Sequence, residues 1–490
     1  MLLAPCLALA LSFPADPEAP PAPPREFRAV WVATVDNIDW PSKRGLPTAE
    51  AQAELSAIFD KAAALHLNAV ILQVRPMGDA LYSSKLEPWS EFLTGKQGKA
   101  PDPAWDPLET AVAEAHRRGL ELHAWFNPFR AWHPAAKSES DKSHLTRSHP
   151  EWIKHYGNFQ WLDPGQPAAR AWSLRVMEDV VRRYDVDGIH IDDYFYPYPV
   201  KGQDFPDRDS YARHGHGLRS EWRRANVDAF VHDMYAMVKR VKPWVKVGIS
   251  PFGIYRPGVP SGIQANLDQV EGLYADPKRW LAEGWCDYLS PQLYWKIGQP
   301  HQAYPVLLRW WLAQNPKGRH LWPGNFASQI STPADWPVSE IIDQIDMTRR
   351  HPGAGGNVLF SMKPLMADAK GIDAALLAGP YKQTALVPPS PWLGDKPPVQ
   401  PTLVTVTTPD ELRVRIDMKP ANLKPVRLWA IWTRYAQEWS LEALPVDEKG
   451  LARPMASGGK PLNEVAVAAV DRNGALSAYA LWKPDVRTSE

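Results

Sequence analysis

Short apolar segments alternate with longer segments of helical period from Phe27 to about Leu377. This alternation is typical of repeated strand and helix units that build a parallel sheet. Eight segments are predicted strands: Phe27–Thr34, Asn68–Val74, Glu121–Phe126, Gly188–Asp192, Val245–Ser250, Tyr288–Tyr294, His320–Pro323 and Asn357–Ser361. Eight such units in roughly 350 residues predict an α/β fold, a (β/α)8 TIM barrel with enlarged loops. Such barrels place their chemistry at the carboxyl ends of the strands.

The segments between the predicted strands carry apolar residues at helical spacing. Two of them place five apolar residues each on one helix face: Leu55, Ile58, Phe59, Ala62 and Leu65, and Val227, Phe230, Val231, Met234 and Val238. Asp106 followed by Pro107 predicts a capped helix start, and Gly119 predicts the end of that helix.

The pattern changes after a proline-rich segment, PPSPWLGDKPPVQP, at residues 388–401. Alternating strands are predicted beyond it: Leu403–Thr407, Leu412–Ile416, Arg427–Thr433 and Val465–Val470. They predict a small β-sandwich, and LRVRI and EVAVAAVDRNGALS resemble parts of a fibronectin type III module. We therefore expect a barrel over residues 25–387, a linker over 388–401 and a fibronectin-like domain over 402–490. The linker should separate this domain from all eight strands.

The first 24 residues are interpreted as a leader. An apolar run from Leu2 to Phe13 precedes a Pro- and Ala-rich stretch, Pro14–Pro24. The run is shorter than the roughly 20 residues that span a bilayer, but it is typical of a secretory signal. We expect export to the periplasm or cell envelope, with lipidation at Cys6 as an alternative that would tether the chain to a membrane.

Charge and composition narrow the classes of partner. Lys and Arg total 55, as do Asp and Glu, and the pI is near 7.3, which argues against nucleic acid or an anionic membrane surface. No glycine-rich phosphate loop follows a predicted strand, and the histidines are scattered, so neither a cofactor nor a metal is predicted. The 23 Trp residues fit either large cores or a cleft lined with rings that face sugars.

The segment DGIHIDDYFYP, residues 187–197, carries the strongest chemical signal. An apolar strand that ends in two adjacent carboxylates is costly without a functional reason. Side chains alternate along a strand, so if His190 points into the barrel, Asp192 and Tyr194 do too, and Asp193 lies on the rim or faces the next strand. We predict Asp192 and Asp193 as the catalytic pair. The structural alternative is a helix cap for one and an arginine partner for the other.

Other predicted strands end in polar or aromatic residues that would meet at the same face. The predicted substrate-binding residues are Arg75, Asp79, Asn127, Arg130, His190, Tyr194, Gln292, Tyr294 and Trp295. Asp36, Asn325 and Lys363 also follow strands, and we interpret them as loop or core residues. Together these positions predict a polar cleft with aromatic walls.

Several motifs, in order and in register, resemble those of the glycosyl hydrolase-like 10 family of bacterial envelope proteins: FRAVWVATVDNIDWPS, QVRPMGDALYSS, HAWFNPFR, DGIHIDDYFYP, GISPFGIYRPG, YADPKRWLAEGW and YLSPQLYW. The resemblance covers about Arg25 to Leu377. It implies a (β/α)8 glycoside hydrolase acting on the glycan strands of peptidoglycan, often exported or lipid-anchored and sometimes followed by fibronectin-like modules. It also implies that Arg75, Asp79, Asn127, Arg130, Asp192, Asp193, Gln292 and Tyr294 face the substrate.

Two schemes of hydrolysis remain open. In the first, Asp192 works with a carboxylate from another strand, for which Asp36 and Asp79 are available. In the second, the acetamido group of an N-acetylated sugar attacks its own anomeric carbon, while one Asp orients that group and the other is the acid. Two rival functions are a non-catalytic glycan-binding barrel and a metal-dependent hydrolysis such as deacetylation.

Overall fold

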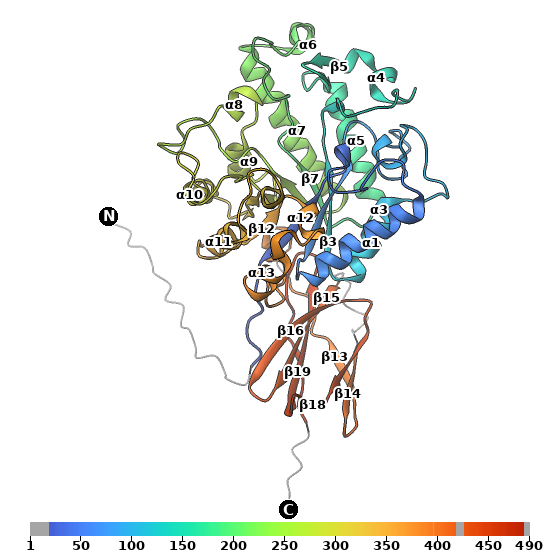
Figure 1. The fold of residues 1–490 in the computed structure, drawn as a ribbon, viewed down its shortest axis with the longest axis vertical. Coiled ribbons are helices and arrows are strands. Elements are labelled where there is room, and N and C mark those ends of the chain that lie inside the picture. Colours follow the sequence, from blue (N-terminus) through green and yellow to red (C-terminus); the bar gives the residue numbers. More distant parts are fainter. Residues whose placement is uncertain (1–18, 395, 418–425, 485–490) are drawn as a thin grey trace, which may run out of the picture.

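The computed structural model describes residues 19–394, 396–417 and 426–484. Most of the predicted leader, including Cys6, lies outside these residues. Figure 1 shows a large part in which helices surround a central sheet, and a smaller part made of the C-terminal strands. Within the described chain, no helix is both long enough and apolar enough to cross a membrane.

The central sheet is parallel and has nine strands in the order β10-β9-β8-β7-β3-β2-β1-β12-β11. All eight predicted strands are confirmed, with changed bounds. The strands are β1 Phe27–Val32, β2 Ala69–Arg75, β3 Glu121–Phe126, β7 Gly188–Ile191, β8 Lys246–Ile249, β9 Tyr288–Leu289, β10 His320–Leu321, β11 Gly324–Asn325 and β12 Gly356–Leu359.

Two predicted strands are interrupted where proline follows. The sixth ends at Leu289, two residues before Pro291, and the seventh divides into β10 and β11 on either side of Trp322 and Pro323. Proline has no N–H to give to a neighbouring strand, so the ladder of hydrogen bonds stops there. Single parallel bridges, Gln292 with Gly324 and Leu321 with Ala354, continue the pairing beyond the interruptions.

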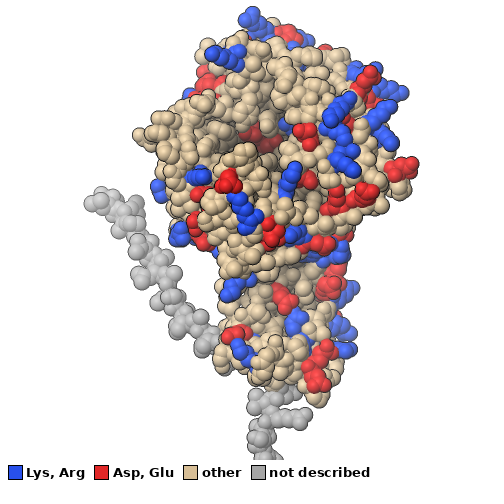
Figure 2. Space-filling view, in the orientation of Figure 1, with Lys and Arg blue, Asp and Glu red and all other residues tan. Residues whose placement is uncertain are grey.

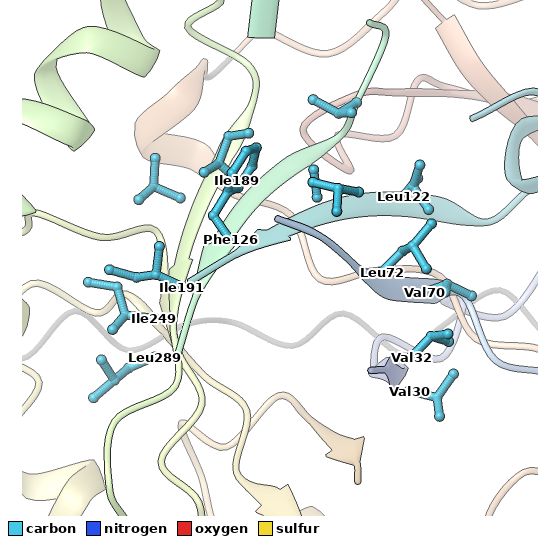
Figure 3. Packing of buried hydrophobic residues seen from close by; sticks show 14 of the residues in the cluster. Val30, Val32, Val70, Leu72, Leu122, Phe126, Ile189, Ile191, Ile249 and Leu289 are labelled. Carbon is cyan, nitrogen blue, oxygen red and sulfur yellow. The ribbon is translucent and has the colours of Figure 1, made fainter. Parts of the chain in front are cut away.

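The strands are apolar on both faces because both faces are buried. Val30, Val32, Val70 and Leu72 belong to the large cluster that also includes helix residues such as Leu55, and Figure 3 shows this layer along the strands. Residues at alternate positions, including Ala29, Trp31 and Ile71, form a separate cluster on the other face. This alternation directs Trp31, Gln73 and Trp125 to the face that carries the pocket described below.

The helices of the large part are α1 Thr48–Ala64, α2 Glu91–Thr94, α3 Pro107–Arg117, α4 Leu145–Ser148, α5 Pro167–Arg183, α6 Arg208–His214, α7 Arg219–Val241, α8 Gln269–Gly272, α9 Pro277–Glu283, α10 Tyr304–Ala313, α11 Val338–Arg349, α12 Met362–Met366 and α13 Ile372–Ala378. The two predicted apolar faces are buried on α1 and α7. The predicted cap of α3 is confirmed, since the Asp106 carboxylate accepts hydrogen bonds from the N–H groups of Leu108 and Glu109.

The sequence analysis did not predict a small antiparallel sheet beside the strand ends. It consists of β4 Arg130–Trp132, β6 Phe159–Leu162 and β5 Ile153–Tyr156, in that order. Gly157 and Asn158 join β5 to β6, and Gly157 has φ of 56°. Glycine followed by asparagine between two strand-like runs is a hairpin signal, so this pair of residues could have revealed the sheet.

The C-terminal part contains two antiparallel sheets. One has the order β13-β14-β17, and the other contains β16-β15-β19 with β18 and β20 paired to β19. Their bounds are β13 Thr402–Thr407, β14 Glu411–Asp417, β15 Val426–Tyr435, β16 Glu438–Pro445, β17 Gly450–Pro454, β18 Ala456–Ser457, β19 Lys460–Asp471 and β20 Ala480–Trp482. Residues from both sheets, among them Leu412 and Ile431, share one apolar cluster.

The proline-rich segment is packed against the large part. The indole N–H of Trp392 donates to Asp287 at 2.8 Å, and the buried Ser390 hydroxyl lies 2.9 Å from His320 Nε2. Asp287 and His320 lie at the amino ends of β9 and β10. The C-terminal part is therefore attached at the end of the sheet opposite to the carboxyl ends of the strands. The expectation that the linker separates this part from the strands is wrong.

Candidate active site

A pocket of about 860 Å³ lies at the carboxyl ends of the parallel strands. Its lining comes from seven strands of the parallel sheet or their ends, and includes Trp31, Gln73, Trp125, Asp192, Ser250, Gln292 and Phe360. Figure 2 shows a hollow in the large part with acidic side chains recessed in it. A cavity of about 910 Å³ lies at the opposite end, against the C-terminal part, and in the described part of the chain no strand of the parallel sheet has its carboxyl end there. The first pocket is therefore the candidate active site.

Asp192 and Asp193 lie together in this pocket, directly after β7. Both residues are buried, with 5% and 4% of their surface exposed. The amide nitrogen of Asn127 lies 3.3 Å from Asp192 Oδ1, and the Tyr198 hydroxyl donates to Asp193. Asp193 therefore lines the pocket beside Asp192, rather than lying on a solvated rim. Among the described residues, these are the only carboxylates in the lining.

Burial raises the pKa of both carboxyl groups, but their hydrogen-bond partners and neighbouring charges differ. Burial, together with the charge of Asp193, raises the pKa of Asp192 to about 7, and Arg130 partly opposes the rise. Burial also raises the pKa of Asp193, but hydrogen bonds from Tyr198 and Gln292 oppose that rise by stabilising its carboxylate. The pair can therefore hold a proton on Asp192 and a negative charge on Asp193 near neutral pH.

Four of the predicted substrate-binding residues line the pocket: Arg130, Tyr194, Gln292 and Tyr294. The Arg130 guanidinium lies 5.0 Å from the centre of the Tyr194 ring, and its Nε donates to the carbonyl of Pro76 at 2.9 Å. These contacts fix a positive charge close to the two carboxylates. The structure thus brings these residues together as the sequence analysis expected.

Arg75 does not line the pocket, so its predicted position is corrected. Its side chain and that of Glu87 are both completely buried, and two hydrogen bonds of 2.5 and 2.7 Å join them. Arg75 also donates to the carbonyls of Asn127 and Pro128, at 2.7 and 3.1 Å. Each of its three side-chain nitrogens is engaged within the fold, because an unpaired guanidinium would be too costly at this depth.

Asp79 and Asp36 also lie outside the pocket lining. Asp79 is completely buried, accepts hydrogen bonds from Met77 N and Gln97 Nε2, and has a pKa raised to about 7 by burial. The Asp36 side chain is 56% exposed and lies 3.6 Å from Arg44. Neither carboxylate is placed to act with Asp192 across the pocket. The geometry disfavours the scheme with two carboxylates from different strands.

Asn127, His190 and Trp295 lie next to the lining without joining it. Asn127 supports Asp192 from behind, and Trp295 packs against Phe252 with ring centres 5.6 Å apart. His190 lies beneath the pocket, where its Nε2 is 3.2 Å from the Trp31 indole nitrogen and 3.0 Å from Ser250 Oγ. The sequence analysis predicted that these three residues contact the substrate. The structure instead places them behind the lining, where they support residues that form it.

A chain of buried hydrogen bonds continues below His190. An indole N–H can only donate, so Trp31 makes His190 Nε2 the acceptor, and a neutral His190 then donates through Nδ1 to the Tyr288 hydroxyl at 2.9 Å. Burial lowers the pKa of His190 well below its usual value, which keeps it neutral. Tyr288 in turn donates to His123 Nδ1 at 2.7 Å. A Cβ at Gly248 would lie 1.9 Å from the Tyr288 ring, so glycine is required there.

Ten of the lining residues are absent from the predicted set, and Gln73, His133 and Tyr198 are among them. Tyr198 follows the acidic pair in the run YFYPYP, but the run alone does not show which ring turns back. His133 follows β4 and lies 5.3 Å from Phe159 of β6, ring centre to ring centre. Burial lowers its pKa to about 4, so its imidazole is neutral near pH 7. The place of His133 in the lining depends on the small antiparallel sheet, which the sequence analysis did not predict.

The family model of the glycosyl hydrolase-like 10 proteins matches residues 26–338. The chain belongs to this family. The match covers β1 to β11, and therefore the strand ends that form most of the pocket. No group of three or more His, Cys, Asp or Glu side chains in the described part of the chain is arranged to hold a metal ion.

Two curated relatives support the assignment. The chain is 43% identical over 396 residues to the glycosyl hydrolase YngK of Bacillus subtilis, covering 78% of this chain and 77% of that protein. It is 34% identical over 367 residues to the glycosyl hydrolase DigH of Escherichia coli K12, covering 68% and 82%. Both names describe glycosyl hydrolases, so this chain is a glycoside hydrolase-like protein.

A solved structure extends the comparison to the fold. The glycoside hydrolase domain of PgaB (BpsB) from Bordetella bronchiseptica is similar, with a TM-score of 0.50 and 14% sequence identity. The similarity covers 72% of this chain and 98% of that domain. At this identity the likeness shows the α/β fold of the large part.

Proposed function

We propose that this protein is a glycoside hydrolase that cleaves bacterial cell-wall glycan, with N-acetylated peptidoglycan strands as substrate. One observation carries the proposal: two adjacent buried carboxylates, Asp192 and Asp193, lie in an aromatic-lined pocket at the strand ends. Ring faces such as those of Trp31, Tyr294 and Phe360 suit the C–H surfaces of sugars. The family and its named relatives support a carbohydrate polymer as the substrate class.

We infer that the acetamido group of the substrate is the nucleophile. In this scheme Asp193 is ionised and orients the acetamido group, whose carbonyl oxygen attacks the anomeric carbon. Asp192 gives its proton to the leaving oxygen as the glycosidic bond breaks, and the resulting carboxylate then takes a proton from the water that opens the cyclic intermediate. The raised pKa of Asp192 and the hydrogen bonds from Tyr198 and Gln292 that stabilise the Asp193 carboxylate support this division of roles.

The direct test is incubation of the purified full chain with glycan strands, with and without stem peptides, followed by mass spectrometry of the products. Hydrolysis adds one water across each cleaved bond, and a chelator should leave it unchanged. A chain that binds the strands but releases no fragments would instead be a glycan-binding barrel. Fragments that lack acetyl groups but have uncut backbones would indicate deacetylation.

An inhibitor should distinguish the two schemes of hydrolysis. An N-acetyl thiazoline sugar copies the cyclised intermediate, so it should inhibit at least about a hundredfold more strongly than the free sugar. A 2-fluoro sugar should label no carboxylate, because no covalent glycosyl-enzyme forms. Inhibition constants and the mass of the intact protein provide the two measurements. An adduct on any aspartate of the large part would contradict substrate assistance.

The pH profile should have a limb for each carboxyl group. Asp192 must be protonated, so kcat/KM should fall as the pH rises above about 7, its raised pKa. Asp193 must be ionised, so activity should also fall at low pH. Tyr198→Phe removes a hydrogen bond to the Asp193 carboxylate and should move the acidic limb upward by roughly one pH unit. A basic limb that stays in place serves as the internal control.

The same proposal covers the architecture and location of the chain. β10 and β11, at the two ends of the sheet order, are separated by two residues, which supports closure of the sheet into a (β/α)8 barrel. The cluster shared by the two C-terminal sheets supports a fibronectin-like sandwich.

Export to the periplasm or cell envelope, by the leader or with a lipid on Cys6, follows from the substrate class. Fractionation of cells that express the full chain tests the location.

A further inference from the structure

Gln73 has a side-chain amide whose oxygen is fully engaged and whose nitrogen is not. The residue is completely buried on β2 and lines the pocket. Its Oε1 accepts hydrogen bonds from the backbone N–H groups of Thr34, at 3.0 Å, and Val35, at 2.9 Å. Because backbone N–H groups can only donate, the atom that faces them must be the oxygen. The nitrogen, with both its hydrogens, is therefore fixed on the other side.

The Gln73 nitrogen has no acceptor within the described residues. A buried donor without a partner is costly, and native proteins keep few of them. Gln73 pairs in register with Trp125, which pairs with His190, so Gln73 lies at the level of His190 and two residues deeper than Asp192. A donor at this depth in the pocket suits an acceptor on the bound molecule.

The surroundings of Gln73 narrow the chemistry of that acceptor. Apolar groups dominate this side of the pocket: the Trp31 ring, Ala33, Val35 and Phe360. The Arg130 guanidinium, whose Nη2 also has no acceptor among the described residues, carries a charge and is held by the Pro76 carbonyl and the Tyr194 ring. A neutral donor beside apolar surface matches an acetyl group, whose carbonyl oxygen accepts and whose methyl group needs an apolar contact.

We infer that Gln73 recognises the N-acetyl group of the sugar bound beside Asp192, by donating a hydrogen bond from its Nε2 to the acetyl carbonyl oxygen. A carbonyl oxygen has two lone pairs, so it can accept this bond and still attack the anomeric carbon. A free amino sugar presents an ammonium group, which can only donate and would meet the Gln73 N–H groups without an acceptor. Gln73 is thus a specificity-determining residue for N-acetylated over deacetylated glycan. This inference rests on the proposed function, because it assigns a substrate group to the same pocket.

Three tetrasaccharides with the same β-1,4 backbone test it: those of N-acetylglucosamine, of glucosamine and of glucose. They carry an acetamido, an ammonium and a hydroxyl group at C2. Binding is measured by calorimetry from pH 5 to 9 in the Asp192→Asn background, in which turnover should be at least about a hundredfold slower. With Gln73 intact, the acetylated tetramer should bind about ten- to a hundredfold more tightly than either of the others.

Gln73→Glu is the decisive variant, because its carboxyl oxygen can still accept from Thr34 and Val35 while its ionised form cannot donate. Above the pH at which the introduced carboxyl ionises, the preference for the acetylated tetramer should disappear and the glucosamine tetramer should gain affinity. Gln292→Glu adds a carboxyl to the same pocket and removes a hydrogen bond to Asp193, but keeps the Gln73 donor. It should weaken binding of the acetylated tetramer and still leave it tighter than binding of the glucose tetramer. Thermal unfolding checks that each variant folds.

An unchanged preference in folded Gln73→Glu at high pH would overturn the inference and leave the proposed hydrolase intact. Equal binding of the acetylated and glucose tetramers to the chain with Gln73 would overturn it without use of any Gln73 variant, because a hydroxyl would then suffice. If the acetylated tetramer does not bind, the inference also fails. The proposed function fails separately, if cell-wall glycan is not cleaved.

Discussion

Replacement of Asp192 or of Asp193 by asparagine is expected to lower kcat on the glycan by at least about a hundredfold, the scale for losing a positioned acid or charge. Asparagine at 192 has no proton to give to the leaving oxygen, and asparagine at 193 removes the charge that orients the acetamido group. The measurement is the rate of product release from purified glycan strands at saturating substrate. Binding of the strands should persist in both variants.

Asp79→Asn is the matched control for these two substitutions. Asp79 is as deeply buried as the pair, and its pKa is also raised to about 7, but it lies outside the pocket lining. The same loss of a carboxyl group there should change kcat by no more than a few-fold. Wild-type rates in both Asp192→Asn and Asp193→Asn would remove the pair from the mechanism.

The position of the acidic pair could be predicted because it depends on one strand. β7 is apolar and buried at all four residues, and the carboxylates follow directly after it. Alternation along that strand also placed Asp192 and Tyr194 correctly in the pocket. For Asp193 alternation left two positions open, the rim or a direction toward the next strand, and the structure places it in the pocket lining, where the chain has left the regular strand after Ile191.

The supporting roles of Arg75 and Asp79 could not be predicted in the same way. A strand-end arginine has the same sequence signature whether it faces substrate or a buried acid. The partner that decides, Glu87, is twelve residues away in an irregular segment with no strand or helix pattern. Gln73 is the opposite case, a residue that was not predicted to bind substrate and that lines the pocket. Its function follows from which backbone groups hold its oxygen, and those contacts appear only when β1 and β2 are aligned.

The C-terminal part contributes two arginines to a charge cluster at the amino end of β7. Asp187 is 5% exposed, lies 2.9 Å from His116 Nε2 and accepts a hydrogen bond from Leu122 N. Arg427 and Arg472 each lie 3.6 Å from its other oxygen. These cations hold the pKa of Asp187 well below its usual range, against the effect of burial. The C-terminal part thus neutralises a buried charge that belongs to the large part.

Arg427→Ala is therefore expected to lower the free energy of unfolding by about 3 kcal/mol, because it leaves Asp187 partly uncompensated and removes the bond to the Leu120 carbonyl. Urea denaturation near pH 7 measures the loss, and Arg415→Ala, which breaks an exposed pair with Asp417, should leave the midpoint nearly unchanged.

Asp187 has a lowered pKa in the folded state, so its pairing stabilises the fold above about pH 4 and ceases to do so as the pH falls further. The deficit of Arg427→Ala should narrow over that acidic range. Hydrolysis by the folded variant should persist, because the pocket lies at the opposite end of the strands; a variant that is fully stable would show that the C-terminal part is only appended to the large part.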